Sequence, residues 1–307
     1  MKENNLKISV VLPVFNGVNT LKTTLDSLSN QTLKEFELIC CIDGTIDGSE
    51  LLLESYRTIF SKLIIIRNNV NIGLGATMNR LMFHANCDYV AIAEQDDFYY
   101  PDRLELQFKI FESNSNVGIV SGMSEFWNGE KVVFDFPGLL KGGNQYPRGK
   151  DMFLLNFRNQ IKVVNSCMMI RRRTHIDNGL YFTKHHPNIS IDWTYILRFS
   201  LVSEIYGIPK VLVRLDRRND RNSVTSNKKK QFLAARELVR SFKYEYPNLI
   251  SGKDYAYAKA TNYLMELSYM KFNKYVLNWL FFVISNPLEI RYYINLRNRI
   301  HRKLFKK

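Results

Sequence analysis

The sequence predicts an α/β fold in which a mainly parallel sheet carries helices on both faces. Two observations predict it. Short β-branched runs alternate four times with helix-like segments over about the first 110 residues, and each run ends in a polar turn. This alternation is typical of βαβ units. Ligands of such sheets bind where the strands end, at a switch in strand order.

The first predicted strand, 8–12, is a β-branched run that ends at Pro13. The helix that follows places Leu21, Leu25 and Leu28 on one face. The same signals predict strands at 36–42, 63–66 and 89–93, and helices at 20–28, 49–60, 76–85 and 101–111. The four strand-end segments are therefore expected to gather on one edge of the sheet; they are 13–17, 43–47, 68–73 and 94–97.

The regular alternation of predicted strands and helices ends after residue 116. Apolar runs predict strands at 117–120, 163–170 and 211–215, and a helix at 192–201. The glycine-rich, basic segment 138–149 is predicted to be a loop. Residues 216–230 are highly charged and predict a surface loop, and the chain is helical in pattern from 231 onward. We therefore divide it into a domain at 1–225 and a helical, basic extension at 226–307.

Composition narrows the class of protein. Hydrophobic residues make up 46% of 307, so a core can form, and the formal net charge of +14 suits anionic partners such as nucleic acid, a lipid surface or phosphorylated small molecules. The four cysteines form no CxxC pair, which argues against a zinc site or disulfide framework. The N-terminal segment 1–7 is polar and unlike a signal peptide, so we expect a cytoplasmic protein.

The turn at 94–97 (EQDD) is the strongest chemical signal. Carboxylates at the end of a parallel strand can hold a hard divalent cation, and Mg²⁺ or Mn²⁺ there would bridge a diphosphate. The alternative is that these acids only cap the helix that begins near Pro101.

Five segments, in this order, resemble the family-2 glycosyltransferases. They are 8–16 (ISVVLPVFN), 31–32 (QT) with 36–39 (FELI), 43–49 (DGTIDGS), 71–73 (NIG) with Ala76 and Asn79, and 94–97 with 101–104 (PDRL). The resemblance implies a GT-A fold, with a nucleotide-sugar-binding half at 1–115 and an acceptor half at 116–225. It also implies an inverting enzyme that takes a nucleotide-activated sugar, expected to be a UDP-sugar, and needs Mn²⁺ or Mg²⁺.

The resemblance also implies which residues of this chain form the site. Asp96 matches the acid that binds the metal most directly. The nucleotide-sugar-binding residues would be Pro13, Phe15, Asn16, Asp43, Asn71, Gly73, Asn79, Glu94, Gln95, Asp96 and Arg217. Several have a plainer alternative: core packing for Phe15, turn formation for Asp43, Asn71 and Gly73, and a solvated basic loop for Arg217.

Two segments of the second half resemble the family more loosely: 165–171 (NSCMMIR) and 191–198 (IDWTYILR). The second would place Asp192 as the general base that takes the proton of the acceptor hydroxyl. The alternative for Asp192 is a helix N-cap. The likeness is to bacterial enzymes of surface-polysaccharide synthesis, which implies a saccharide or lipid-linked saccharide acceptor in capsule or lipopolysaccharide.

Four positions depart from the family pattern. Ile42 and Ile191 stand where acids are common, Glu94 begins a turn that usually begins with Asp, and Asn165 stands where a histidine is common. These changes put donor selectivity in doubt more than the reaction class. They keep open a non-catalytic protein that binds nucleotide sugars on the same fold.

The C-terminal tail from Arg291 carries seven Lys or Arg residues and no acid, beside an apolar, aromatic run at 275–284. This pattern suits contact with a membrane surface, on its cytoplasmic face, and the alternative is a helical cap with a solvated end. Nucleic-acid binding is not expected, because the sequence contains no zinc-finger, helix-turn-helix or RNA-binding motif.

Overall fold

The computed structural model describes residues 6–161, 163–184, 190–218 and 228–305. The chain divides into two compact units. The sheet unit comprises Met1–Phe153 and Lys162–Ser226, and the helical unit comprises Leu154–Ile161 and Asn227–Lys307. Each unit is described separately below.

The first half of the sheet unit is the predicted alternation. Its strands are β1 (Ile8–Val14), β2 (Phe36–Asp43), β3 (Leu63–Asn68) and β4 (Tyr89–Ile92). They pair in parallel in the order β3-β2-β1-β4, so the strand order reverses direction between β1 and β4. Pro13 extends β1 beyond the prediction. It lies past the last pair with β4, Val11 with Ile92, where β1 is bound only to β2.

The second half completes a mixed sheet. The strands are β5 (Asp97–Tyr99), β6 (Val117–Trp127), β7 (Val132–Phe136), β10 (Met168–Arg171) and β11 (Glu204–Asp216). Antiparallel β10 joins β4 to β6, β11 runs parallel to β6, and β5 pairs antiparallel with β11. A separate small hairpin is formed by β8 (Leu140–Lys141) and β9 (Asn144–Gln145).

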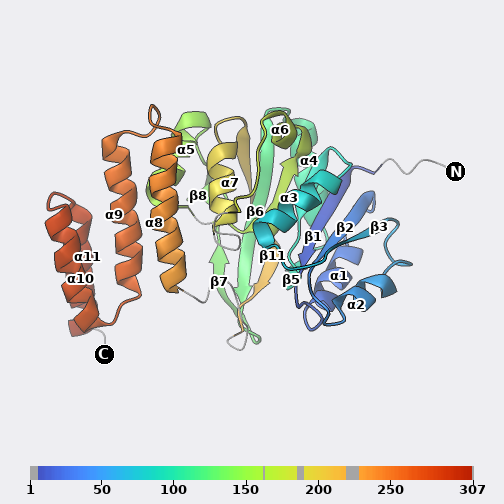
Figure 1. Cartoon of the computed structure of the whole chain (residues 1–307), viewed down its shortest axis with the longest axis horizontal. Helices are drawn as coiled ribbons and strands as arrows, with labels where there is room; N and C mark the ends of the chain where they lie inside the picture. Colours follow the sequence, from blue (N-terminus) through green and yellow to red (C-terminus); the bar gives the residue numbers. More distant parts are fainter. Residues whose placement is uncertain (1–5, 162, 185–189, 219–227, 306–307) are drawn as a thin grey trace. The chain divides into compact units, whose positions relative to one another are not determined.

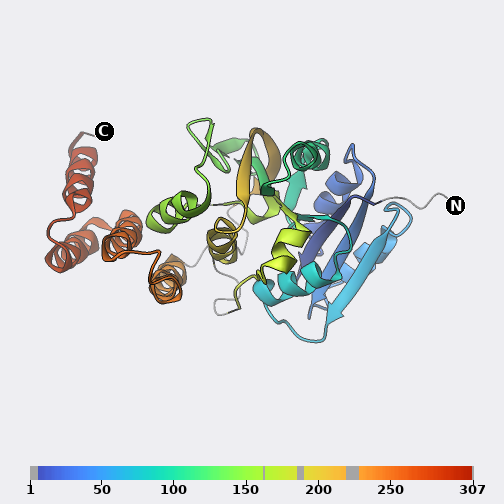
Figure 2. The ribbon, with the colours of Figure 1, turned by 90° about the horizontal axis from the view of Figure 1, so that it is seen from above.

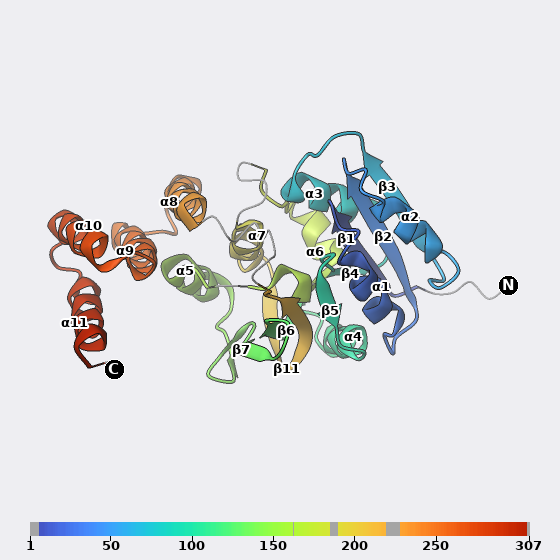
Figure 3. The same ribbon diagram turned by 90° about the horizontal axis from the view of Figure 1, so that it is seen from below.

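Helices cover both faces of the sheet, as the sequence predicted (Figures 1 and 3). On one face lie α1 (Leu21–Ser29), α2 (Ser49–Ser55) and α4 (Arg103–Ser113), and on the other α3 (Leu74–His84) and α7 (Ile191–Phe199). Neighbouring strand residues alternate between the two cores: Val10 packs with the first set and Val11 with the second. Each fully buried aliphatic side chain contributes on the order of 2 kcal/mol.

Several predicted boundaries are wrong. The helix predicted at 49–60 ends at Ser55, and the strand predicted at 163–170 is a 3₁₀ turn, Asn165–Cys167, followed by β10. The predicted loop 138–149 contains the β8–β9 hairpin and the start of α5 (Gly149–Asn159). A short helix, α6 (Arg172–Asp177), follows β10, and the sequence did not predict it. All four cysteines are buried free thiols, as expected.

The helical unit contains α8 (Lys228–Glu245), α9 (Gly252–Ser268), α10 (Phe272–Ser285) and α11 (Ile290–Phe305), drawn orange to red in Figure 2. Ala260, Leu267, Tyr275, Phe282 and Tyr292 form its small core. A capping box at Ser251 starts α9. Among the described residues, no helix has both the length and the apolar character needed to cross a bilayer.

Candidate functional site

The carboxyl ends of the four parallel strands lie on one edge of the sheet. The register sets Asp43 beside Asn68, and Val11 beside Ile92 at the end of β4. The polar segments that follow these strands therefore meet on this edge, as predicted. Because the strands are parallel, loops far apart in the sequence become neighbours, and they do so where the strand order reverses.

Three carboxylates gather after β4. One oxygen each from Glu94, Asp96 and Asp97 lie within 4.8 Å of one another. Asn165 donates from Nδ2 to Oε1 of Glu94 at 3.1 Å, and its buried amide oxygen has no hydrogen-bond partner in the described part of the chain. Carboxylate and amide oxygens are the ligands that Mg²⁺ and Mn²⁺ prefer. The residues present therefore fit a divalent cation.

Asp97 is the most buried acid of this turn. Its carboxylate accepts a hydrogen bond from the hydroxyl of Ser166, and its main-chain oxygen accepts one from Thr24 Oγ1 at 2.8 Å. Burial, and then the negative charge of Glu94, raise the pKa of Asp97 to about 8. A bound cation would favour the ionised form of this group.

The alternative in which the acids cap the next helix is wrong. Helix α4 begins at Arg103, and its N-cap residue is Asp102, which makes no side-chain capping bond. Asp97 is instead the first residue of strand β5, where it pairs with Leu215 of β11. The acid is therefore held by the sheet and not by a helix end.

A fully buried arginine braces the acidic turn from behind. Arg103 Nη2 donates to the main-chain oxygen of Ile92 at 2.8 Å, and its guanidinium lies 4.5 Å from the ring centre of Tyr99. The Tyr99 hydroxyl accepts from the main-chain nitrogen of Glu94 at 2.7 Å. These contacts connect the end of β4, the turn and β5, so the turn has little freedom to move.

Gln95 joins the acidic turn to the loop after β1. Its Oε1 accepts from the main-chain nitrogen of Phe15 at 2.9 Å, and its Nε2 donates to the Phe15 oxygen at 2.7 Å. The ring of Phe15 is 44% exposed, so the alternative of core packing is wrong. A Cβ on Gly17 would lie 2.4 Å from Gln95 Oε1. A larger residue at position 17 would therefore displace the Gln95 side chain from the main chain of Phe15. Beside it, Asn16 Oδ1 accepts from the Thr45 hydroxyl at 2.7 Å.

Asp43 holds the loop after β3. Its buried carboxylate accepts hydrogen bonds from the main-chain nitrogens of Ile72 at 2.9 Å and Gly73 at 3.1 Å, and from Asn68 Nδ2 at 2.8 Å. Gly73 has φ of 85°, and its nitrogen also contacts Asn71 Oδ1 at 3.0 Å. The predicted contact of Asp43 with a base or ribose stays a prediction. In the structure this acid shapes the wall of the site.

Asn79 lies on α3 and Asp192 on α7, and their predicted roles in donor binding and as general base stay predictions. The amide of Asn79 makes two bonds with the main chain of Phe182, at 2.8 and 2.9 Å, and so fixes a segment about 100 residues away. Asp192 is the second residue of α7, whose N-cap is Ser190, so the N-cap alternative for Asp192 is wrong. Its Oδ1 accepts from the Trp193 nitrogen at 2.8 Å.

Arg217 follows β11. Its main-chain nitrogen donates to the Trp127 oxygen at 2.7 Å, and its guanidinium lies 4.9 Å from the ring centre of Phe126. Leu215, two residues earlier, pairs with Asp97, so Arg217 follows β11 close to the acidic turn. Its positive charge opposes the rise in the pKa of Asp97 that burial causes. The rest of the predicted basic loop, 219–227, lies outside the described residues.

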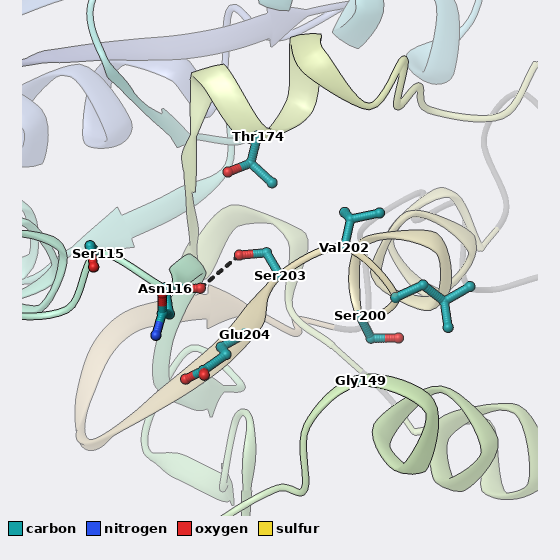
Figure 4. A pocket seen from close by; sticks show the side chains of 9 residues that line it. Ser115, Asn116, Gly149, Thr174, Ser200, Val202, Ser203 and Glu204 are labelled. Carbon is teal, nitrogen blue, oxygen red and sulfur yellow. Dashed lines mark hydrogen bonds between the residues drawn. The ribbon is translucent and has the colours of Figure 1, made fainter.

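A hollow of the sheet unit lies away from the acidic turn (Figure 4). It has a volume of about 440 Å³ and is lined by hydroxyl groups, including those of Thr174 and Ser203, with the Glu204 carboxylate. Asn116 and Glu204 stand where β6 and β11 begin, whereas the acidic turn stands where β4 ends. The hollow is therefore on the opposite edge of the sheet from the acids.

Three polar residues that hold the site were missed in the sequence: Thr24, Asp47 and Ser166. Thr24 and Ser166 bind Asp97, and Asp47 accepts from the Val18 nitrogen at 3.0 Å. The available signal was a hydroxyl on an otherwise apolar face. Thr24 lies on the buried face of α1, and Ser166 precedes an apolar strand.

Comparison with known proteins agrees with this geometry. The model of the family described as Glycosyl transferase family 2 matches residues 9–179, more than half of the chain. EpsE of Bacillus subtilis (strain 168), classed by name with the glycosyltransferases, is 30% identical over 184 residues, which cover 57% of this chain and 66% of EpsE. The poly(ribitol-phosphate) beta-glucosyltransferase of Bacillus spizizenii is 32% identical over 41% of this chain and 20% of its own length. The chain thus matches less than two thirds of either relative.

Solved structures show the same fold. TarS 1-349 of S. aureus, crystallised with UDP, superposes with a TM-score of 0.65 at 19% identity, covering 89% of this chain and 75% of that one. The mannosyltransferase PcManGT of Pyrobaculum calidifontis, in complex with GDP-Man and Mn²⁺, gives a TM-score of 0.56 at 13% identity, with coverage of 98% and 88%. At these identities the likeness establishes the GT-A fold.

Proposed function

Because this chain belongs to glycosyl transferase family 2, we propose that it transfers a sugar from a nucleotide diphosphate donor to an acceptor hydroxyl. The observation that carries the proposal is the acidic turn, where three carboxylates and the unpartnered amide oxygen of Asn165 meet at the switch in strand order. Asp96, with Glu94 beside it, would hold Mg²⁺ or Mn²⁺. The cation would supply charge neutralisation for the leaving diphosphate.

The donor would lie along the strand-end edge. Phe15 offers an exposed ring to a base, and the loop that Asp43 organises forms a wall beside it. Arg217, near the acidic turn, suits a phosphate oxygen because guanidinium groups donate hydrogen bonds with a positive charge. The complex of TarS with UDP supports a UDP-sugar as the donor of this chain.

Asp192 would act as the general base. Its carboxylate would take the proton of the acceptor hydroxyl while that oxygen attacks the anomeric carbon. The bond from the anomeric carbon to the diphosphate oxygen breaks in the same step, and the nucleotide diphosphate leaves. A single displacement of this kind inverts the anomeric centre and needs no covalent enzyme intermediate.

The acceptor is proposed to be a growing polysaccharide or a lipid-linked saccharide, as in capsule or lipopolysaccharide synthesis. The names of the relatives support this class, since one glucosylates poly(ribitol-phosphate). Sugar transfer would take place on the cytoplasmic side of the membrane, where nucleotide sugars are available.

Two substitutions test this proposal in opposite ways. In a thermal-shift panel of UDP-glucose, UDP-N-acetylglucosamine and GDP-mannose, Asp96→Asn should lose the Mn²⁺-dependent rise in melting temperature. Asp192→Asn should keep that rise but lower transfer by roughly 10²–10⁴-fold, because only the base is removed. Full transfer by Asp192→Asn would refute the base, and donor binding without transfer by the wild type would favour a non-catalytic binding protein.

We also propose that the C-terminal helices contact an anionic membrane surface. One face of α10 and the turn after it expose apolar side chains, with Leu277 at 70%, Phe281 at 65%, Ile284 at 79% and Leu288 at 93% exposure. Lys271 and Lys274 stand at the start of this helix. Apolar groups beside lysines suit the boundary between headgroups and acyl chains.

Point substitutions are a sharper test than truncation, because α11 places Tyr292 in the core of the helical unit. Leu277→Ser with Ile284→Ser should reduce co-sedimentation with phosphatidylglycerol vesicles severalfold. Leu51→Ser with Ile59→Ser, at exposed sites on the sheet unit, is the matched control. Equal binding by the two double variants would remove α10 from the membrane contact.

A further inference from the structure

A small basic cleft lies between α8 and α9 of the helical unit. These helices run side by side in Figures 1 and 3, and the cleft has a volume of about 90 Å³. Its lining is formed by Arg236, Val239, Arg240, Tyr255, Lys259, Asn262 and Tyr263. None of these residues belongs to the donor edge of the sheet, and the proposed reaction assigns them no role.

Three of the lining side chains are cationic, and the cleft keeps an excess of positive charge. Arg236 pairs with Glu266, which neutralises one of them. Arg240 and Lys259 are exposed, and within the described residues neither makes an ion pair. Lys259 Nζ lies 5.5 Å from the ring centre of Tyr255. Two such cations from facing helices suit one ligand oxyanion between them.

A buried amide adds a second, independent observation. Asn262 lines the cleft, is fully buried, and its oxygen has no hydrogen-bond partner among the residues that the structure describes. Its nitrogen faces Gln160 Oε1 at 3.5 Å, and Gln160 is oriented by a bond of 3.1 Å to the Ala258 oxygen. An unpaired buried acceptor is costly, and a ligand hydroxyl that donates to it would relieve the cost.

We propose that the cleft between α8 and α9 binds the phosphate ester of a polyol, with Arg240 and Lys259 on the phosphate and Asn262 on a hydroxyl. The two chemical requirements, an oxyanion and an alcohol a few bonds apart, are met by a polyol phosphate and by the headgroup of a glycerol phospholipid. That this site holds the phosphate-bearing part of an acceptor rests on the proposed function. The binding itself does not.

The test uses the full chain and two double variants that remove equal charge. Arg240→Gln with Lys259→Gln empties the cleft of its exposed cations, and both side chains lie on the surface, so folding should be kept. Lys229→Gln with Lys253→Gln removes one exposed lysine each from α8 and α9 outside the cleft. Binding of glycerol 3-phosphate is measured by calorimetry, and binding of phosphatidylglycerol vesicles by co-sedimentation, with no nucleotide sugar present.

The expected result is that the cleft variant binds glycerol 3-phosphate roughly tenfold or more weakly than the wild type, while the control variant is nearly unchanged. Loss confined to the vesicle arm also supports the site and identifies the source of the phosphate as a lipid. Inorganic phosphate, which has no alcohol, should bind more weakly than glycerol 3-phosphate. Equal binding by the two double variants in both arms, or equal affinity for the two phosphates, overturns the proposal.

These outcomes are separate from those of the proposed function. The cleft assay contains no nucleotide sugar, so its result does not depend on whether Asp96→Asn or Asp192→Asn changes donor binding or transfer. Conversely, the cleft variant should keep the Mn²⁺-dependent thermal shift with nucleotide sugars, because its substitutions lie in the helical unit.

Discussion

The two units hold their polar side chains by different means. On the donor edge of the sheet unit, the bonds that matter join residues far apart in the chain, such as Gln95 with Phe15 and Asn79 with Phe182. In the helical unit many bonds are local, as in the capping box of Ser251 and Asp254, and among the described residues the long-range bonds are fewer, such as Gln160 with Ala258 and Arg158 with Asp254. The difference teaches that the donor edge depends on the whole sheet, whereas the α8–α9 cleft can change its exposed side chains at little cost in stability.

The largest expected effect comes from removing Arg103, whose side chain joins the end of β4 to β5. Arg103→Met should lower the free energy of unfolding of the sheet unit by about 3 kcal/mol, because it removes a buried cation whose partners remain buried. Urea denaturation with hydrogen exchange of β4 and β5 measures it. Lys109→Met, an exposed site on the same helix, should change stability by less than about 0.5 kcal/mol. A similar loss in both variants would contradict the bracing role of Arg103.

The second effect is a pH dependence within the sheet unit. Burial, and then the positive charge of Arg172, lower the pKa of His175 from 6.5 to about 4. The unfolded chain takes up this proton near pH 6.5 and the folded chain only near pH 4, so the contribution of His175 to stability falls as the pH falls through that window. Between pH 8 and pH 5 this contribution should fall by about 2 kcal/mol, measured as the change in the stability difference between the wild type and His175→Gln, because the raised pKa of Asp97 acts in the opposite direction.

This pH effect is measured by urea denaturation of the wild type and of His175→Gln at several pH values. Gln can still bond to the Tyr195 hydroxyl, which lies 2.8 Å from Nδ1 of His175, but it does not titrate. The stability difference between the wild type and His175→Gln should therefore change between pH 8 and pH 5, whereas the control His84→Gln should follow the wild type. Parallel slopes for all three proteins would show that His175 is not the group responsible.

The smallest expected effect tests a local hydrogen bond of the helical unit. Ser251→Ala removes the N-cap of α9, whose Oγ accepts from the Asp254 nitrogen at 3.1 Å, and should lower the stability of the helical unit by about 1 kcal/mol. Hydrogen exchange in the first turn of α9 reports it. Ser268→Ala, at the other end of the same helix, is the control. A loss that spreads to β1–β4 would show that the two units do not differ as described.

The sequence by itself determined the first half of the sheet unit. Apolar runs of four to eight residues have the length of a buried strand and are too short for a typical helix. Leu21, Leu25 and Leu28 recur with the period of a helix. Both kinds of element therefore follow from local patterns. The strand-end turns, and among them the cluster of Glu94, Asp96 and Asp97, follow from parallel strands whose ends must share an edge. The resemblance to the family rested on the same segments.

Only the tertiary structure decided what each polar group does there. Asp97 resembles a helix cap in the sequence, but its pairing with β11 buries it and raises its pKa. Asn165 looked like a loss relative to the family pattern, yet it contacts Glu94 across a separation of 71 residues. The physical reason is that burial and electrostatic environment are sums over neighbours from many segments, whereas a sequence pattern records only the neighbours along one chain.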